Sequence, residues 1–144
     1  MKRKIALCVF SALLLSACAI RQNVRPVTEL RDAEICVIAN PLVRPAFLKA
    51  LTHAMEQKGF QVRQLAQDAA LNECPLMATY DAHWQWDLAM YMNYAEIKVY
   101  QQAKPTGEAK YDSRRGGANM NKFIDADKKV LELVTQLFPG GPPR

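Results

Sequence analysis

Residues 76–101 contain two consecutive stretches of alternating apolar and polar side chains, and they constrain the fold more than any other feature. In the first stretch, one face receives the apolar side chains Leu76, Ala78, Tyr80, Ala82, Trp84 and Trp86. The other face receives Thr79, Asp81, His83, Gln85 and Asp87. A period of two is typical of a strand with one buried face. We therefore predict a long strand over residues 76–87.

The second stretch, residues 89–101, predicts a strand that forms a hairpin with the first, turning near Asp87 and Leu88. Its core face would carry Ala89, Tyr91, Ala95, Ile97 and Val99. Its opposite face would carry Met90, Met92, Tyr94, Glu96 and Lys98. The sequence thus places two methionines and a tyrosine outside the core.

The segment before the hairpin has the pattern of a β-α-β unit. Residues 34–39 form a short apolar run, and residues 60–65 alternate, so both are predicted strands. Between them, Phe47, Leu48, Leu51, Ala54 and Met55 recur at helical spacing and predict a helix over about residues 43–58. Gly59 fits the left-handed position that ends a helix. If the two strands share a sheet, they should be parallel with a right-handed crossover.

After the hairpin, residues 104–108 predict a turn, residues 109–114 a short strand, and residues 125–138 a final helix. Asp125 can cap this helix, and Val130, Val134 and Leu137 form its inner stripe. The predicted fold class is therefore α/β (α+β), a two-layer sandwich of order β-α-β-β-β-α. Its mixed sheet would carry two helices on one face. We expect one domain over residues 34–138 and a flexible tail over residues 139–144.

The N-terminus resembles a bacterial lipoprotein export signal. Lys2, Arg3 and Lys4 precede an apolar run that is too short to span a bilayer permanently, and the run closes with Leu15-Ser16-Ala17-Cys18. That closing tetrapeptide looks like a lipobox. The resemblance implies that residues 1–17 are a cleaved signal peptide and that Cys18 carries diacylglycerol and a further acyl chain such as palmitate. The alternative is an ordinary secretory signal with a free Cys18 thiol.

The residue after Cys18 bears on localisation. Ala19 stands where an Asp would favour retention in the inner membrane, so we expect an outer-membrane lipoprotein whose domain faces the periplasm. Residues 18–33 show no apolar periodicity and are predicted to be a lipidated N-terminus and flexible tether. Fifteen extended residues reach about 50 Å, so such a tether would not require contact between the domain and the bilayer.

The charge balance argues against a nucleic-acid partner. The full chain has a net charge of +5, but without Lys2, Arg3 and Lys4 the mature chain has 16 basic and 14 acidic residues. A net charge of +2 is too small to indicate a polyanion partner. We predict binding to the membrane through the lipid and to a periplasmic or envelope protein, with the oligomeric state left open.

Two cysteines, Cys36 and Cys74, remain in the predicted domain and would be exposed to an oxidising compartment. We predict a disulfide between them. The alternative is a zinc site with His53 and His83. It is disfavoured because neither pair shows the close spacing typical of zinc ligands, and we expect no metal and no cofactor apart from the lipid.

Several groups of residues could bind a ligand or take part in catalysis, but each group also has a simpler structural interpretation. Tyr80, Trp84 and Trp86 could line a ligand pocket but fit a core better. Asp81, His83 and Asp87 could transfer protons, but a solvated strand face fits better because no nucleophile accompanies them. We therefore predict no catalytic residue and no enzymatic activity. Arg114, Arg115, Gly116 and Gly117 could bind an anion or a phospholipid headgroup, or could form a plain turn.

The predicted partner-binding residues are Met90, Met92, Tyr94, Arg114 and Arg115. Unbranched methionine side chains suit adaptable protein contacts, and exposed apolar patches mark interfaces. A bulge that switches the facing of the methionines would instead place them in the core.

Several segments together resemble a family of small uncharacterised proteobacterial lipoproteins. These are the lipobox, Cys36, Gly59-Phe60, the residues 84–87 and 95–100, Gly116-Gly117 and Asn121-Lys122-Phe123. The resemblance covers nearly the whole mature chain and brings no known active site. By element order alone, the layout also resembles the curli secretion lipoprotein and the lipoprotein activator of penicillin-binding proteins.

The function that these observations favour is that of an outer-membrane-anchored lipoprotein with a periplasmic protein-binding domain. It would be an auxiliary component of an envelope assembly or transport process. The alternative is an inhibitor or immunity-type lipoprotein directed against a toxin or a cell-wall hydrolase, binding through the loop from Arg114 to Asn121. A hydrolase that uses Asp81 and His83 is the weakest of the three hypotheses.

Overall fold

The computed structural model describes residues 19–144. The predicted signal peptide and Cys18 lie outside the described residues. In the described part of the chain, no helix combines the length and the apolar character needed to cross a bilayer.

One mixed sheet of six strands forms the back layer of the domain, in the order β1-β6-β5-β4-β2-β3. The strands are β1 (Arg21–Arg25), β2 (Glu34–Ile38), β3 (Gln61–Leu65), β4 (Leu76–Asp87), β5 (Ala89–Gln101) and β6 (Lys104–Asp112). Strand β2 is parallel to β3 and to β4, and the β4-β5, β5-β6 and β1-β6 pairs are antiparallel. The predicted fold class is therefore confirmed. The sheet has one strand more than the five predicted strand ranges and two more than the predicted order β-α-β-β-β-α, which counts four.

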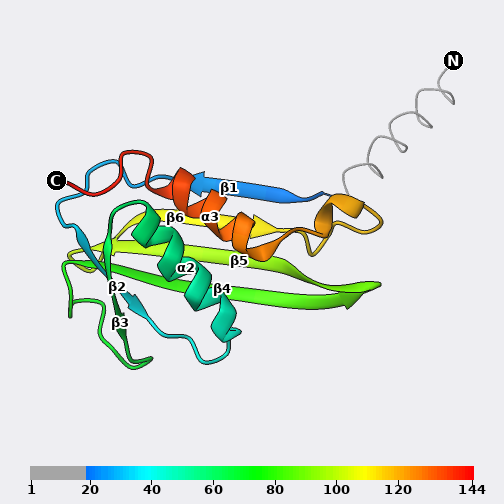
Figure 1. Cartoon of the computed structure of the whole chain (residues 1–144), viewed down its shortest axis with the longest axis horizontal. Helices are drawn as coiled ribbons and strands as arrows, with labels where there is room; N and C mark the ends of the chain where they lie inside the picture. The colour runs from blue at the N-terminus through cyan, green and yellow to red at the C-terminus, as the bar shows by residue number, and fades with distance from the viewer. Residues whose placement is uncertain (1–18) are drawn as a thin grey trace, which may run out of the picture.

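Two helices, α2 (Pro45–Gln57) and α3 (Ala126–Leu137), lie side by side over one face of the sheet (Figure 1). Helix α2 starts at a proline, whose missing amide proton costs nothing in the first turn, and Gly59 follows its end with a φ of 101°. Helix α3 is capped by Asp125, whose side chain accepts a hydrogen bond of 3.0 Å from the Lys128 amide. A short 3-10 helix, η1 (Met120–Lys122), precedes it.

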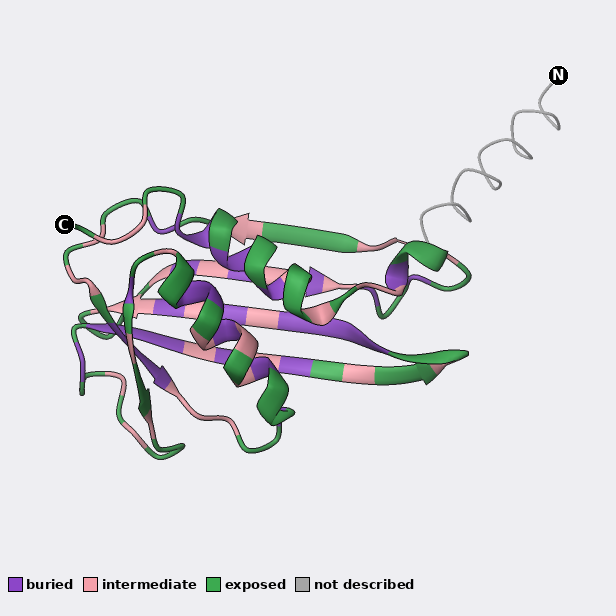
Figure 2. Cartoon of the chain, in the orientation of Figure 1, coloured by how far each residue is buried: buried purple, intermediate pink, exposed green. Residues whose placement is uncertain are grey.

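The core lies between the helices and the sheet. Figure 2 shows buried residues, in purple, on both helices and along the central strands. The helices contribute Phe47, Leu51, Ala54, Met55, Val130, Leu133, Val134 and Leu137. Strand β4 contributes Leu76, Ala78, Tyr80 and Ala82, as the alternation predicts. The exception is Trp86, which is 69% exposed, because the β4-β5 hairpin projects beyond both helices (Figure 1).

The prediction of a flexible tether over residues 18–33 is wrong for Arg21–Arg25, because these residues form β1 and pair antiparallel with β6. The chain stays fixed beyond this strand: the Val27 amide donates a 2.8 Å hydrogen bond to the Leu137 carbonyl, and the Val27 side chain is buried. Little of residues 18–33 is therefore left to act as a tether. At the other terminus, Pro142 of the predicted tail lies beside Gly59.

A β-bulge changes the predicted facing on β5. His83 pairs with Tyr94 but Trp84 pairs with Met92, so Asn93 is an extra residue without a partner on β4. The bulge turns Met92 into the core, where it is 1% exposed, and the prediction that Met92 lies on the opposite face is wrong.

The second turn is also shorter than predicted. Gln102 and Ala103 form it alone, with φ values of 52° and 61°. Strand β6 therefore begins at Lys104, inside the segment that the sequence assigned to a turn.

Candidate functional site

The sheet face without helices carries a stack of three side chains, His83, Tyr94 and Arg114, which we call the His83 stack. His83 and Tyr94 lie directly opposite each other on β4 and β5, and their ring centroids are 5.2 Å apart. The Arg114 guanidinium carbon lies 4.3 Å from the centroid of the Tyr94 ring. At the other end, Asp81 Oδ2 lies 3.2 Å from His83 Nε2. The stack thus joins β4, β5 and the turn that follows β6.

Asp112 fixes Arg114 in this position. Its carboxylate accepts hydrogen bonds of 2.9 Å from Arg114 Nε, 2.6 Å from Nη2 and 3.0 Å from the Arg114 amide. These contacts hold the pKa of Asp112 below its ordinary value and raise the pKa of Arg114. Burial beneath Arg114, together with the nearby Glu96 carboxylate, raises the pKa of Tyr94. The guanidinium is therefore a fixed cation over a neutral ring.

The rest of this face is charged and internally compensated. The Glu96 carboxylate lies 2.9 Å from Lys110 Nζ and 3.2 Å from Lys98 Nζ. Burial by itself would raise the pKa of Glu96, but the two ammonium groups outweigh it and lower that pKa. Both lysines have raised pKa values because of the same contact. The face offers specific charges without a large excess of either sign.

The Asp81-His83 pair does not form a catalytic arrangement with the nearby hydroxyls. Both side chains are about half exposed, at 43% and 52%. The Ser113 hydroxyl is buried and bonded to the Asn93 carbonyl at 3.3 Å. Thr79 lies on the same strand as the pair but lines a separate cavity. Asp87, the third predicted member, is instead paired with Lys122. The geometry is that of a solvated ion pair beside an aromatic ring.

The predicted partner-binding residues do not form one surface. Met92 is in the core, and Tyr94 is 8% exposed beneath Arg114. Met90 is 51% exposed near the end of the β4-β5 hairpin. The predicted set is therefore corrected: Met92 leaves it, whereas Met90, Arg114 and Arg115 remain accessible.

Arg114 and Arg115 do lie together, around a cavity of about 420 Å³ that is also lined by Ala19, Arg21 and Asp112. Arg21 comes from β1, which the sequence pattern did not predict. Its pairing with Asp112 brings a third guanidinium to the same place. The anion-binding hypothesis for the turn at Arg114 thus gains a residue from the opposite end of the chain.

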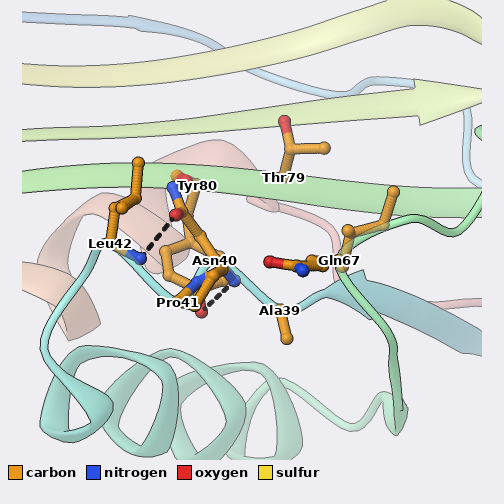
Figure 3. Close-up of a pocket in the computed structure, with 8 residues that line it drawn as sticks. Ala39, Asn40, Pro41, Leu42, Gln67, Thr79 and Tyr80 are labelled. Atoms are coloured by element: carbon orange, nitrogen blue, oxygen red, sulfur yellow. Dashed lines mark hydrogen bonds between the residues drawn. The ribbon is translucent and has the colours of Figure 1, made fainter.

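A second cavity of about 430 Å³ was not predicted from the sequence, and Figure 3 shows its lining. It lies where β2 ends, next to Asn40, Gln67 and Tyr80. The Asn40 amide donates to Tyr80 Oη at 2.9 Å, and the Asn40 side chain donates to the Tyr80 carbonyl at 3.1 Å. Asn40 Oδ1 accepts a third hydrogen bond, of 3.1 Å, from the Leu42 amide, so the side chain of Asn40 is occupied in holding its loop. Of the three aromatic residues that the sequence offered for a ligand pocket, Tyr80 lines this cavity, whereas Trp84 and Trp86 are not among its lining residues.

The cysteines confirm one prediction and remove its alternative. Cys36 and Cys74 form a disulfide, and both are buried beside Met77. In the described residues, Glu34, Cys36 and Cys74 are the one group close enough to share a metal ion, but the two sulfurs are bonded to each other. His53 lies against Gln57 on α2. The structure therefore contains no zinc set of two cysteines and two histidines in the part it describes.

Comparisons with known proteins identify a fold but no family. No family model matches the sequence, and no curated protein matches it. PelC from Paraburkholderia phytofirmans, crystallised as a dodecamer, has a similar structure with a TM-score of 0.57 and 10% identity. The match covers 83% of this chain and 98% of PelC. A dodecameric point variant of PelC matches with a TM-score of 0.53 and 11% identity, covering 83% and 94% of the two chains.

At such low identity the likeness shows the fold alone. Both of these structures are of PelC, and neither is the curli secretion lipoprotein or the activator of penicillin-binding proteins whose element order resembles this one.

Proposed function

We propose that this protein is an outer-membrane lipoprotein, anchored through Cys18, whose periplasmic domain acts by binding protein in an envelope assembly or transport process. Two observations support the proposal besides the N-terminal motif. The fold resembles PelC, which forms a dodecamer, and within residues 19–144 one whole face of the sheet carries no helix. The bound protein can be another envelope component or further copies of this chain.

The observation that carries the proposal is the His83 stack. Tyrosine and arginine are the residue types that most often dominate interface energies. Here they are already held in place by Asp112 and by His83, so little side-chain entropy is lost when a partner binds. The side chains of His83 and Arg114 are 52% and 48% exposed, which leaves both accessible to a partner.

Crosslinking in cells tests the proposal, with mass spectrometry of the captured proteins and of the N-terminal peptide. The variant His83→Ala/Arg114→Ala removes both accessible members of the stack. The matched control, Lys49→Ala/Lys128→Ala, removes exposed side chains from the helical side of the domain. We expect acylated Cys18 and a captured species that the stack variant weakens and the control retains. Equal capture by both variants would contradict the role of this face.

An inhibitor or immunity role is the second candidate, and the exposed loop residue Met120 favours it. Met120 is 65% exposed within the loop from Arg114 to Asn121. This function predicts a tight one-to-one complex that Met120→Ser weakens and that His83→Ala alone leaves intact. The same crosslinking experiment therefore separates the two candidates.

A further inference from the structure

Large apolar side chains are exposed at the tip of the β4-β5 hairpin. Trp86 and Met90 pair directly across the two strands and are 69% and 51% exposed. Leu88, at the turn, is 78% exposed and has a φ of 60°, a conformation that is costly for leucine. A polar residue or glycine would be expected at such a turn if it faced only water.

The loop that carries Met120 is attached to the same tip. Lys122 Nζ donates hydrogen bonds of 2.5 Å to Asp87 Oδ2 and to the Gly117 carbonyl. Tyr91 and Phe123 add an aromatic contact with centroids 5.0 Å apart. These contacts fix the loop to the hairpin. We call Trp86, Leu88, Met90 and Met120 the apolar tip; all four are at least half exposed.

The chain enters the domain at this end. In Figure 1 the N-terminal end of β1 lies on the same side of the molecule as the free end of the hairpin and η1. Ala19 lines the cavity formed with Arg21, Arg114 and Arg115. Only Ala19 and Ile20 separate Cys18 from β1, and three residue steps span at most about 10 Å. An acyl chain on Cys18 would therefore place the bilayer surface close to these arginines.

We propose that this end of the domain docks on the bilayer that holds the lipid anchor. The apolar tip enters the interfacial region, and Arg21 and Arg115 bind lipid phosphate groups. Aromatic and long apolar side chains favour the membrane-water interface, and guanidinium groups bind phosphate in a bidentate manner. The inference rests on the acylation of Cys18 in the proposed function. It goes beyond that function because it fixes which end of the domain faces the membrane.

The charge around the cavity agrees with a phosphate-bearing surface. Three guanidinium groups surround one carboxylate, that of Asp112, which is already bonded to Arg114. Arg21 and Arg115 therefore retain uncompensated charge next to the anchoring point. A protein partner would need no such closeness to Cys18, whereas a lipid surface is held there by the anchor itself.

The two tryptophans allow a direct test, because the chain contains no others. Trp84 packs against Phe47 beneath α2, with ring centroids 6.2 Å apart, whereas Trp86 is at the tip. The acylated full chain would be reconstituted in vesicles of phosphatidylethanolamine and phosphatidylglycerol with brominated acyl chains. The variant Trp84→Phe reports on Trp86 alone, and Trp86→Phe reports on Trp84 alone.

We expect the bromolipids to reduce Trp86 emission at least about twofold, because a tryptophan at the membrane-water interface comes close to the brominated acyl chains. Trp84 emission should remain nearly unchanged, because Trp84 packs beneath α2. The variant Arg21→Gln/Arg115→Gln should weaken the quenching of Trp86, and Lys49→Gln/Lys128→Gln should not. Acylated protein with unquenched Trp86 would overturn the docking proposal and leave the lipoprotein function standing. An unmodified Cys18 in the mass spectrum would overturn both.

Discussion

Breaking the Cys36–Cys74 disulfide is expected to reduce the free energy of unfolding by about 4 kcal/mol. The two cysteines are 38 residues apart, and the chain-entropy model gives about 13 cal/mol/K for a loop of this length. The loop contains α2 and β3, so the unfolded chain would regain the freedom of a large part of the domain. A domain of this size is stabilised by about 5–15 kcal/mol in total, so the loss would be a large fraction of its stability.

Urea unfolding of the purified mature protein, with and without dithiothreitol, measures this loss. Reduction keeps both side chains in place, so it isolates the effect of the crosslink. The variant Cys36→Ala/Cys74→Ala adds the cost of a small cavity, because both residues are buried beside Met77. This variant is also the control for the reductant, since dithiothreitol should leave its unfolding curve unchanged.

A loss below about 1 kcal/mol on complete reduction would refute the reasoning. It would mean that the unfolded chain already holds residues 36 and 74 close together, and the slope of the unfolding curve would then differ little between the oxidised and reduced proteins.

Three further predictions concern single residues. No described residue bonds the buried Tyr111 hydroxyl, so Tyr111→Phe should raise the thermal midpoint by a few degrees, equivalent to about 1 kcal/mol; a lower midpoint in calorimetry would contradict this. Met92→Ala should cost about 2–4 kcal/mol in urea unfolding and Met90→Ala less than about 0.5 kcal/mol, and equal losses would argue against the bulge at Asn93. The Arg114 contact lowers the pKa of Asp112 in the folded state. The contact therefore stabilises the fold fully at a pH above 3.8, the ordinary pKa of the carboxyl group, and this stabilisation is lost as the pH falls through the lowered pKa. Arg114→Gln should therefore flatten the acid side of the stability-pH curve, and an unchanged curve would show that the contact is not formed in solution.

The elements that the sequence predicted correctly are those with a local pattern. Helix α3 shows its cap and its stripe within thirteen residues, from Asp125 to Leu137, and β4 has six apolar residues at alternate positions. The disulfide followed from the redox compartment and the count of remaining cysteines. For the helix and the strand, the information lies in the residues of the element itself.

The candidate site depended on features without such a pattern. A bulge adds one residue and reverses the facing of what lies beyond it, and Asn93 carries no mark that distinguishes it from an ordinary strand residue. For this reason the predicted patch of Met90, Met92 and Tyr94 was divided between tip, core and stack. Tyr94 and His83 could be placed opposite each other only once the register was known.

Strand β1 shows most clearly why part of the fold is invisible in the sequence. Four of its five residues are polar, and only Val24 packs against the core, so no alternation of apolar side chains marks it. Arg21, Asn23 and Arg25 pair with Asp112, Lys110 and Glu108 of β6. On the helical face, Gln22 Nε2 donates to Glu132 of α3 at 2.7 Å. All these partners lie more than eighty residues away, and the complementary charges become evident only when the strands are placed together. The strand also matters for function. A flexible tether would let the domain lie about 50 Å from Cys18, whereas β1 begins within about 10 Å of it. A domain held this closely cannot avoid the bilayer surface if Cys18 is acylated, so the end that it presents there, with its arginines and its exposed tryptophan, becomes part of how the protein works.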